Sequence, residues 1–299
     1  GTSYDFKVFV SSPNNVFDCD AYNDTSSLVN IFAGGALCGT YTIGGASADF
    51  SNFTDAVSAL NSVGISCPVI FNVRDSVFDE QVKLYDVQGS SVINTITFRG
   101  ESGDSSIAGI HYQLSNNNND YSFALDGASY VYFSDLLISR SNGTYSMLIQ
   151  GGSHDITVSS SRLDGDVLSP RYSVDSVLTF LGNNMEGKTI SLHHPVGTDA
   201  GSIRIEDNYL NYIYLNNASN VQIKNNSGNS NGGHSYIFQL DTCSNITFSN
   251  NLLRRSYFYA DTNVTFLSND FVSEYNWYNV YNERCHQVSL SDNNYRSYY

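Results

Sequence analysis

The chain has 299 residues, enough for one large domain or two small ones, and length alone does not decide because solenoids grow by adding coils. Hydrophobic residues make up 41% of it and aromatic residues 13%, whereas charged residues are only 14%, well below the usual value of about a quarter. The formal net charge of −15 disfavours nucleic acid and anionic membrane surfaces as partners and favours neutral ones.

Membrane insertion is not expected, because no run of about 18 apolar residues occurs. No basic-then-apolar signal sequence starts at Gly1, as expected of a mature chain or of a part excised from a larger multidomain protein. The five cysteines cannot all pair with one another, which leaves at least one thiol free or paired outside the chain.

The N-terminal part divides into a short segment and the start of the main domain. We expect residues 1–38 to form an irregular segment packed on the domain that follows, which spans residues 39–299. Cys38 precedes the first strand predicted in that domain and Cys67 precedes the second, so we prefer a Cys38–Cys67 disulfide. A Cys19–Cys38 bond is the alternative.

One amphipathic helix is predicted near residues 51–63. Apolar residues recur at helical spacing, Ser51 is a candidate cap at the start and Gly64 follows the end. Such a helix would cover the open end of a solenoid core, which must be shielded from water and from pairing with other strand edges.

The strands around this helix resemble a known family. The relevant stretches read GTYTIGG from Gly39, PVIFNVR from Pro68, FDEQVK from Phe78 and ITFRGESGD from Ile96. They resemble secreted, pectin-lyase-like, right-handed parallel β-helix modules, usually found in large bacterial cell-surface proteins, and the resemblance extends to about Asp164. It implies fold and export but no single reaction.

Known β-helix enzymes supply a further comparison of motifs. The polygalacturonase-like motifs Asn-Thr-Asp, Asp-Asp, Gly-His-Gly and Arg-Ile-Lys do not occur in the chain, and Gly233-His234 is followed by Ser235. A pectate-lyase-like group of acidic residues with an Arg or Lys base is not recognisable either.

The second half contains an internal repeat. Seven eight-residue segments align without gaps, with first residues 25, 47, 18, 25, 18 and 24 positions apart. If the interval of 47 residues covers two coils, the repeat averages about 22 residues, which is typical of a solenoid. The segments begin at Val131, Ile156, Ile203, Val221, Ile246, Val264 and Val288.

The columns of this alignment predict strands followed by a corner. The first and third columns are apolar and the second and fourth mostly polar, which indicates a strand with one buried face. The eighth column is apolar again, apart from Gly228. The sequence therefore predicts an all-β, right-handed parallel β-helix with one N-terminal capping helix.

Asparagine dominates the sixth column. Asparagine tolerates left-handed backbone angles, and stacked amides can hydrogen-bond along a column, so we interpret the column as a structural asparagine ladder. A polar recognition strip is the alternative. The residues are Asn208, Asn226, Asn251, Asn269 and Asn293.

An outward strip of tyrosines is the candidate binding site. The residues seven positions before successive anchors are Tyr214, Gln239, Tyr257 and Tyr281. Aromatic rings beside hydrogen-bonding groups are typical of sugar-binding surfaces, although a tyrosine ladder that only stabilises the sheet is the alternative. Neighbours on the same face are Tyr212, Asp241, Arg255, Tyr259 and Glu283, and Trp277 and Tyr278 could extend the surface.

Catalytic and metal candidates are weaker. Arg204, Glu206 and Lys224 gather charge on another face, where the alternative is a surface salt-bridge cluster. Asp164 and Asp166, predicted in a loop, could bind Ca²⁺, or could simply belong to a turn.

Two further residue pairs are predicted to stay apart. His193 and His194 point to opposite faces of a strand, which argues against a shared metal. Cys243 and Cys285 occupy one column two coils apart, beyond disulfide reach.

These observations favour an exported cell-surface module that binds a neutral polysaccharide or cell-surface glycan, or acts as a rigid spacer in adhesion, with no resident cofactor. A polysaccharide lyase or glycoside hydrolase is the second hypothesis, and a self-assembling fibre subunit is the third.

Overall fold

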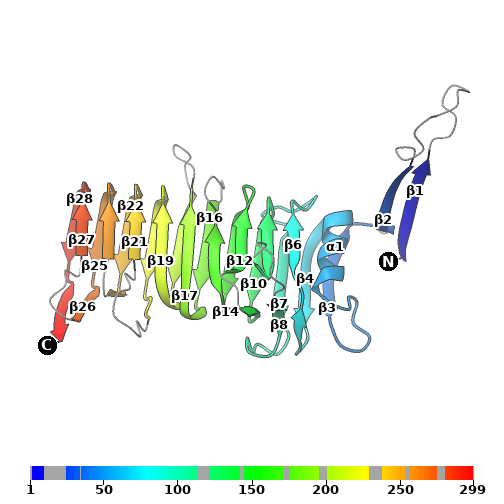
Figure 1. Ribbon diagram of the computed structural model, residues 1–299, viewed down its shortest axis with the longest axis horizontal. Coiled ribbons are helices and arrows are strands. Elements are labelled where there is room, and N and C mark those ends of the chain that lie inside the picture. Colours follow the sequence, from blue (N-terminus) through cyan, green and yellow to red (C-terminus); the bar gives the residue numbers. More distant parts are fainter. Residues whose placement is uncertain are drawn as a thin grey trace, which may run out of the picture.

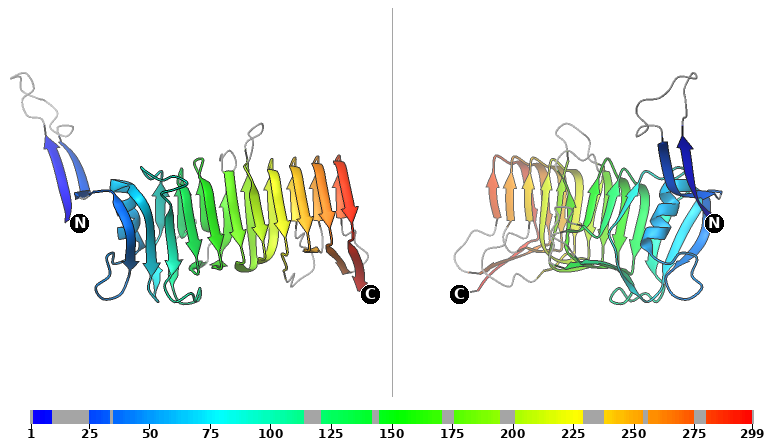
Figure 2. Two further views of the ribbon diagram at one scale, coloured as in Figure 1. Left: turned by 180° about the vertical axis from the view of Figure 1, so that it is seen from behind. Right: turned by 45° about the vertical axis from the view of Figure 1, so that its right-hand side comes forward.

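The structure is a computed structural model that describes residues 2–9, 25–33, 35–113, 121–141, 145–170, 176–194, 201–228, 238–253, 256–274 and 280–298. From residue 37 onward its strands pair in parallel and stack coil upon coil along one axis (Figure 1). The two views of Figure 2 show the same stacking from behind and obliquely. The chain is a right-handed parallel β-helix, the handedness that connections between parallel strands adopt.

Sheet I contributes one strand from each coil, and its strands carry the first four columns of the repeat. Apolar residues in the first and third columns, such as Ile205 and Ile223, are buried in the coils between the first and the last, while the alternate residues point outward. Its members are β3 (Leu37–Ile43), β4 (Ile65–Val73), β7 (Ile96–Gly100), β10 (Ser129–Ser134), β13 (His154–Ser159), β16 (Ser176–Leu181), β18 (Ile203–Glu206), β20 (Ser219–Lys224), β22 (Ser244–Ser249), β25 (Thr262–Leu267) and β28 (His286–Ser291).

Sheet II forms the remaining walls of the early coils and one wall of the late ones. Its members are β5 (Val77–Asp79), β6 (Val82–Tyr85), β8 (Gly109–Gln113), β9 (Phe123–Asp126), β11 (Leu137–Ser141), β12 (Tyr145–Gln150), β14 (Arg162–Asp164), β15 (Asp166–Ser169), β17 (Asn184–His193), β19 (Tyr209–Asn216), β21 (Phe238–Asp241), β24 (Ser256–Tyr259) and β27 (Val280–Glu283). Sheet III closes the last coils with β23 (Leu252–Leu253), β26 (Asp270–Glu274) and β29 (Asn294–Tyr298).

The predicted repeat is confirmed by the strand register. The interval of 47 residues contains two coils, because Leu178 in β16 pairs with Ile156 on one side and with Ile203 on the other. Aromatic rings of the third column stack between coils, with ring centroids of Phe71 and Phe98 4.9 Å apart. The core is therefore one continuous apolar column inside the solenoid.

The sixth column forms a chain of hydrogen bonds along one corner. The backbone N–H of Asn208 donates to Oδ1 of Asn226 over 3.0 Å, and the Asn208 side chain also donates to the Phe180 carbonyl over 2.9 Å. The same pattern links Asn183, Asn208, Asn226, Asn251, Asn269 and Asn293. We call these six residues the asparagine column.

The residues with left-handed backbone angles lie one position before the asparagine column. The expectation that the asparagines themselves adopt these angles is therefore wrong. Every fifth-column residue of the repeat has a positive φ. The sharp turn is made by the exposed residue, while the following asparagine turns its side chain inward to satisfy buried backbone groups. These fifth-column residues are Asp135, Ser160, Gly182, Asp207, Asn225, Asn250, Ser268 and Asp292.

The capping helix is confirmed as α1 (Phe53–Val63), which lies across the N-terminal end of the coils in Figure 1. Its cap is Asn52 rather than Ser51, since Oδ1 of Asn52 accepts the Asp55 N–H over 2.8 Å. Gly64 ends it with a φ of 65°. Phe53 on the buried face of α1 stacks on Phe98, 6.0 Å between centroids.

Where the structure describes the first 38 residues, it shows strands in place of the expected irregular segment. β1 (Thr2–Phe9) and β2 (Thr25–Ala33) pair antiparallel in a two-stranded sheet of their own, which Figure 1 draws projecting from the N-terminal end. Antiparallel backbone hydrogen bonds between these two strands replace the irregular structure expected there.

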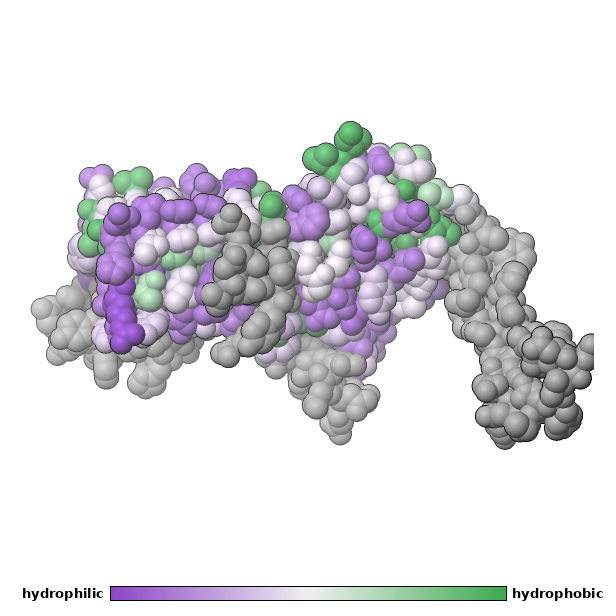
Figure 3. Space-filling model, turned by 90° about the horizontal axis from the view of Figure 1, so that it is seen from above, coloured by the Kyte–Doolittle hydropathy of each residue, from purple (hydrophilic) through white to green (hydrophobic). Residues whose placement is uncertain are grey.

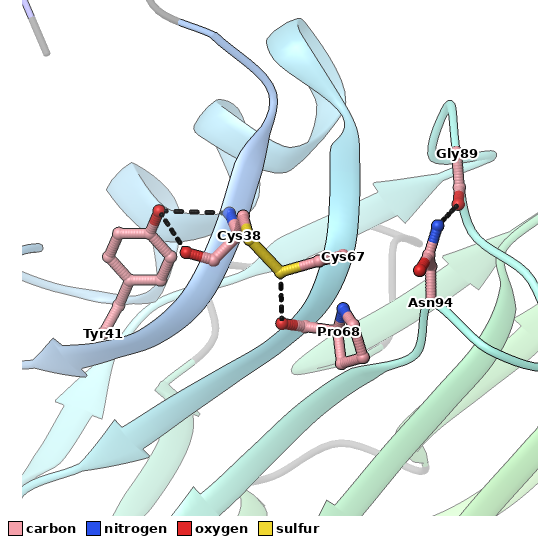
Figure 4. The surroundings of a disulfide bond; sticks show 6 residues. All are labelled: Cys38, Tyr41, Cys67, Pro68, Gly89 and Asn94. Carbon is pink, nitrogen blue, oxygen red and sulfur yellow. Dashed lines mark hydrogen bonds between the residues drawn. A yellow bond between two sulfur atoms is a disulfide. The ribbon is translucent and has the colours of Figure 1, made fainter.

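The preferred disulfide is present. Cys38 on β3 and Cys67 on β4 are bonded across neighbouring strands, with Cα atoms 4.8 Å apart (Figure 4). The Tyr41 hydroxyl donates to the Cys38 carbonyl over 3.3 Å beside it. Cys19 lies outside the described residues.

The face of the molecule seen from above is mainly polar. Figure 3, seen from above, shows hydrophilic and neutral residues over most of the described C-terminal half and apolar ones gathered in the N-terminal third. Val92 and Ile93 are each 76% exposed. No helix in the described chain is long and apolar enough to cross a membrane.

Candidate functional site

The predicted outward strip lies on sheet II. Tyr214, Gln239, Tyr257 and Tyr281 align in register across β19, β21, β24 and β27. Tyr212 precedes this register position by two residues, and Asp241, Tyr259 and Glu283 follow it by two. We call these eight residues the tyrosine face, and Arg255, Trp277 and Tyr278 lie outside the described residues.

The hydroxyls of this face point along the solenoid axis toward the next coil. The Tyr212 hydroxyl donates to Gln239 Oε1 over 2.6 Å. The Tyr214 hydroxyl donates to Asp241 Oδ2 over 2.7 Å. These protons are held by the protein, so the oxygens face a ligand mainly as acceptors.

The rings also stack along the axis. Tyr257 and Tyr281 lie nearly parallel, 7° apart, with centroids 5.3 Å apart. Stacked rings cover one another, so they present edges rather than faces to solvent. Tyr281 is 47% exposed on β27, the terminal strand of its sheet, and its outer ring face is the one that a sugar ring can cover.

Two carboxylates make this face electronegative. Asp241 and Glu283 occupy the same register column, with Tyr259 between them. Burial, and then the Glu283 charge, raise the pKa of the Tyr257 hydroxyl, which therefore stays protonated. Arg284 donates to the Tyr259 hydroxyl over 2.8 Å and its guanidinium lies 5.5 Å from the ring centroid.

The histidine pair is divided between the two sides of the strand, as predicted. The His193 ring meets the Tyr214 ring edge-on, 4.9 Å between centroids. His194 is buried, and burial together with His193 lowers its pKa to about 4. It is therefore neutral near pH 7.

The charged candidates on sheet I form an ion pair. The Arg204 guanidinium donates to both oxygens of Glu206, over 3.0 and 3.1 Å. Lys224 stands beside Glu206 in register on β20. The guanidinium thus engages both oxygens of the Glu206 carboxylate, the group that would have to act on a substrate.

No second carboxylate lies at the positions on β16 and β20 that pair in register with Arg204 and Glu206. Its register neighbours on β16 and β20 are Thr179, Leu181 and Gln222, besides Lys224. Cleavage between two flanking carboxylates needs a pair at close range. The geometry here matches a surface salt bridge.

The two aspartates proposed for Ca²⁺ are separately engaged, and they lie on strands rather than in a loop. Asp164 ends β14 and accepts from Arg162 Nε over 3.1 Å. Asp166 begins β15 and accepts the Thr189 backbone N–H over 2.8 Å, and burial raises its pKa. Within the described ranges no three His, Cys, Asp or Glu side chains group as metal ligands, so Ca²⁺ stays a prediction without structural support.

Cys243 and Cys285 do not bond to each other, as predicted, and both are free thiols. Asp261 stands between them in the column, since its carbonyl accepts the His286 N–H over 2.8 Å and its Oδ1 accepts the Cys243 N–H. Burial raises the pKa of both thiols, so neither is an activated nucleophile.

Two polar features were missed in the sequence. A groove of about 380 Å³ lies beside the asparagine column, and it is lined by Asn225, Asn226, Ser227, Asn250, Asn251, Leu252, Ser268, Asp270 and Asn294. On β6, Lys83 Nζ lies 3.3 Å from Asp126 Oδ2 on β9, which also accepts from Gln150 over 2.9 Å. Reading the fifth and seventh columns together would have indicated the groove.

Comparison with known proteins supports no residue assignment. No family model matches the chain, and no curated protein matches it. Solved structures with a similar course include a pectin methylesterase from Aspergillus niger, with 13% identity, 87% of each chain covered and a TM-score of 0.39.

Two further structures are comparably distant. An alginate lyase from Paenibacillus is 12% identical, with 86% of this chain and 99% of that chain covered and a TM-score of 0.36. A polygalacturonase from Erwinia carotovora is 12% identical, with 90% and 97% covered and a TM-score of 0.29. No site residue is carried over from them.

Proposed function

We propose that this chain is an exported module that binds neutral glycans through the tyrosine face. The observation that carries the proposal is the in-register column of Tyr214, Gln239, Tyr257 and Tyr281 flanked by Asp241 and Glu283. Its hydroxyl oxygens and carboxylates accept hydrogen bonds, and sugar hydroxyls are donors that match them.

Charge selects neutral over acidic polysaccharides. The chain carries a formal net charge of −15, and the face itself contains two carboxylates. Uronate or sulfate groups would be repelled there. A ligand that runs along the axis meets one such set of groups per coil, spaced about 4.8 Å apart.

Export is supported by the Cys38–Cys67 disulfide, because structural disulfides persist in oxidising compartments. We infer that the module belongs to a larger cell-surface protein, where a stiff solenoid would hold the tyrosine face away from the cell.

The test is a glycan array followed by calorimetric titration with neutral oligosaccharides of glucose, mannose, xylose and galactose. Tyr281→Ala removes the exposed ring and is expected to weaken binding at least tenfold, about 1.4 kcal/mol. Tyr132→Ala is the matched control, since Tyr132 is half-buried and points outward from sheet I. Absence of binding, or equal binding by Tyr281→Ala, would reduce the module to a spacer.

Self-assembly is the second candidate, favoured by the last coil. Leu290 and Tyr295 are 56% and 61% exposed, whereas Phe266 and Phe271, their counterparts one coil earlier, are fully buried. End-to-end association would cover them. Sedimentation over a range of concentrations is expected to show oligomers that Leu290→Asp abolishes, and a concentration-independent monomer would reject this role.

A further inference from the structure

A histidine on sheet II bridges two serines. His111 on β8 pairs in register with Ser139 on β11, and the strand alternation with buried Ile110 and Ile138 places both outward. His111 Nδ1 lies 2.8 Å from Ser139 Oγ. His111 Nε2 lies 2.8 Å from Ser141 Oγ, two residues further along β11.

The two contacts cannot be alike in a neutral imidazole, because one ring nitrogen donates and the other accepts. With the proton on Nδ1, the ring donates to Ser139 and accepts the hydroxyl proton of Ser141. Ser139 is only 4% exposed, whereas Ser141 is half-buried and therefore the more accessible of the two hydroxyls. Ser141 is therefore the accessible nucleophile of this arrangement.

Nucleophile, base and a third group that orients the base form the general arrangement of serine hydrolases, irrespective of fold. We propose that Ser141, His111 and Ser139 form an ester-cleaving centre, with Ser141 as nucleophile, His111 as general base and Ser139 as the positioning residue.

The reaction proceeds in two balanced steps. Ser141 Oγ bonds to the ester carbonyl carbon and passes its proton to His111 Nε2, which returns a proton to the departing alkoxide as the C–O bond breaks. An alcohol leaves and Ser141 carries the acyl group. Water then attacks this ester while His111 takes its proton, and the carboxylic acid departs as Ser141 regains a hydrogen.

Neighbouring carboxylates define the substrate. Asp79 stands beside His111 in register on β5, and Asp164 stands beside Ser139 on β14. Asp164 is neutralised by Arg162, 3.0 Å away, whereas Asp79 accepts a backbone N–H from Gln113 over 3.0 Å. A carboxylate at this position repels anionic esters.

The substrate class is thus an uncharged carboxylic ester. That the alcohol is a glycan hydroxyl rests on the proposed function; the esterase chemistry does not. Glycan binding and ester cleavage lie at separate places and can fail separately.

The experiment measures p-nitrophenyl acetate hydrolysis and labelling by a fluorophosphonate, with the labelled peptide identified by mass spectrometry. We expect label on Ser141 and p-nitrophenyl acetate hydrolysis well above the spontaneous rate. Ser141→Ala and His111→Gln are each expected to lower the rate about 10²–10⁴-fold.

Matched variants separate chemistry from folding. Ser289→Ala and His154→Gln change residues on sheet I, whereas the centre lies on sheet II, and both are expected to keep full activity. Ser289 bonds Thr265, and His154 bonds Asp155. Ser139→Ala should lower kcat about tenfold and shift the pH profile, while Ser139→Thr restores both.

Undetectable turnover and labelling in the folded wild type, or activity retained by Ser141→Ala, would overturn the proposal. Absence of glycan binding by the wild type, with p-nitrophenyl acetate hydrolysis present, would reject the proposed glycan role and leave the esterase centre standing.

Discussion

The buried Asp261 carboxylate accepts the backbone N–H of Cys243, 2.6 Å from it, in the coil below. Its second oxygen, Oδ2, has no hydrogen-bond partner among the described residues, and the side chain is fully shielded from water. Burial raises the pKa of Asp261 to about 7, and the nearby Asp241 charge adds to the shift. One carboxyl group therefore links the stability of the last coils to pH.

The sign follows from proton binding. The folded protein holds the Asp261 proton more tightly than the unfolded chain, whose pKa is 3.8. Its contribution to stability is complete below about pH 4, falls as pH rises to about 7 and is constant above that. The difference between a pKa of 3.8 in the unfolded chain and about 7 in the folded protein corresponds to a loss of unfolding free energy on the order of 4 kcal/mol.

Asp261→Asn should remove this dependence. Urea unfolding at pH 5 and pH 8 is expected to show a smaller difference in unfolding free energy for the variant than for the wild type. His194, whose pKa burial lowers from 6.5 to about 4, acts in the opposite direction as pH rises toward about 6.5, so the comparison with the variant is essential. Asp49 and Asp104 have lowered pKa values and contribute only below about pH 4. Equal pH dependence in both proteins would contradict the assignment.

Asn226→Ala, in the asparagine column, is expected to lower the free energy of unfolding. Asn226 donates to the Ile205 carbonyl over 2.7 Å and accepts the Asn208 N–H over 3.0 Å, and both partners would remain buried and unpaired. We expect a loss of about 2–4 kcal/mol in unfolding free energy. Asn250→Gly, at an exposed position with a φ of 55°, is the control and should be neutral or stabilising.

Replacing Gly228 by a larger residue, as the other segments of the repeat suggest, is expected to destabilise the fold. The eighth column is otherwise apolar, so the repeat itself suggests a larger residue there. A Cβ at Gly228 would lie 1.8 Å from the Leu210 carbonyl oxygen, and Gly228→Ala should lower the melting temperature by displacing backbone, at a cost of about 1–3 kcal/mol. Gly35→Ala has no atom within 4 Å of its Cβ and should leave the melting temperature unchanged.

The Cys38–Cys67 disulfide closes a span of 29 residues that contains α1. The double Cys→Ser variant is expected to lose about 3–4 kcal/mol, because the unfolded chain regains loop entropy. Chemical unfolding with and without reductant measures the loss in the wild type. Glycan affinity should be unchanged, since the tyrosine face belongs to the distant C-terminal coils; a parallel loss of affinity would contradict this separation.

The candidate site was predictable only in part. Tyr214 and Tyr257 could be placed on one face because each lies seven residues before an anchor. The ring contacts and the hydroxyl hydrogen bonds that these tyrosines make along the axis could not be predicted. They depend on the rotamers of side chains that lie in neighbouring coils. The Ser139–His111 contact joins residues 28 positions apart, outside the aligned repeat.

By itself the sequence determined the coil, the inward columns and the capping helix, since strand alternation and helical spacing depend on near neighbours along the chain. Only the tertiary structure decided which side chains meet across coils: His111 with its serines, Asp261 with Cys243, and Gly228 with Leu210. The reason is that register between coils is set by loops of unequal length, and contacts a few ångströms long require that register.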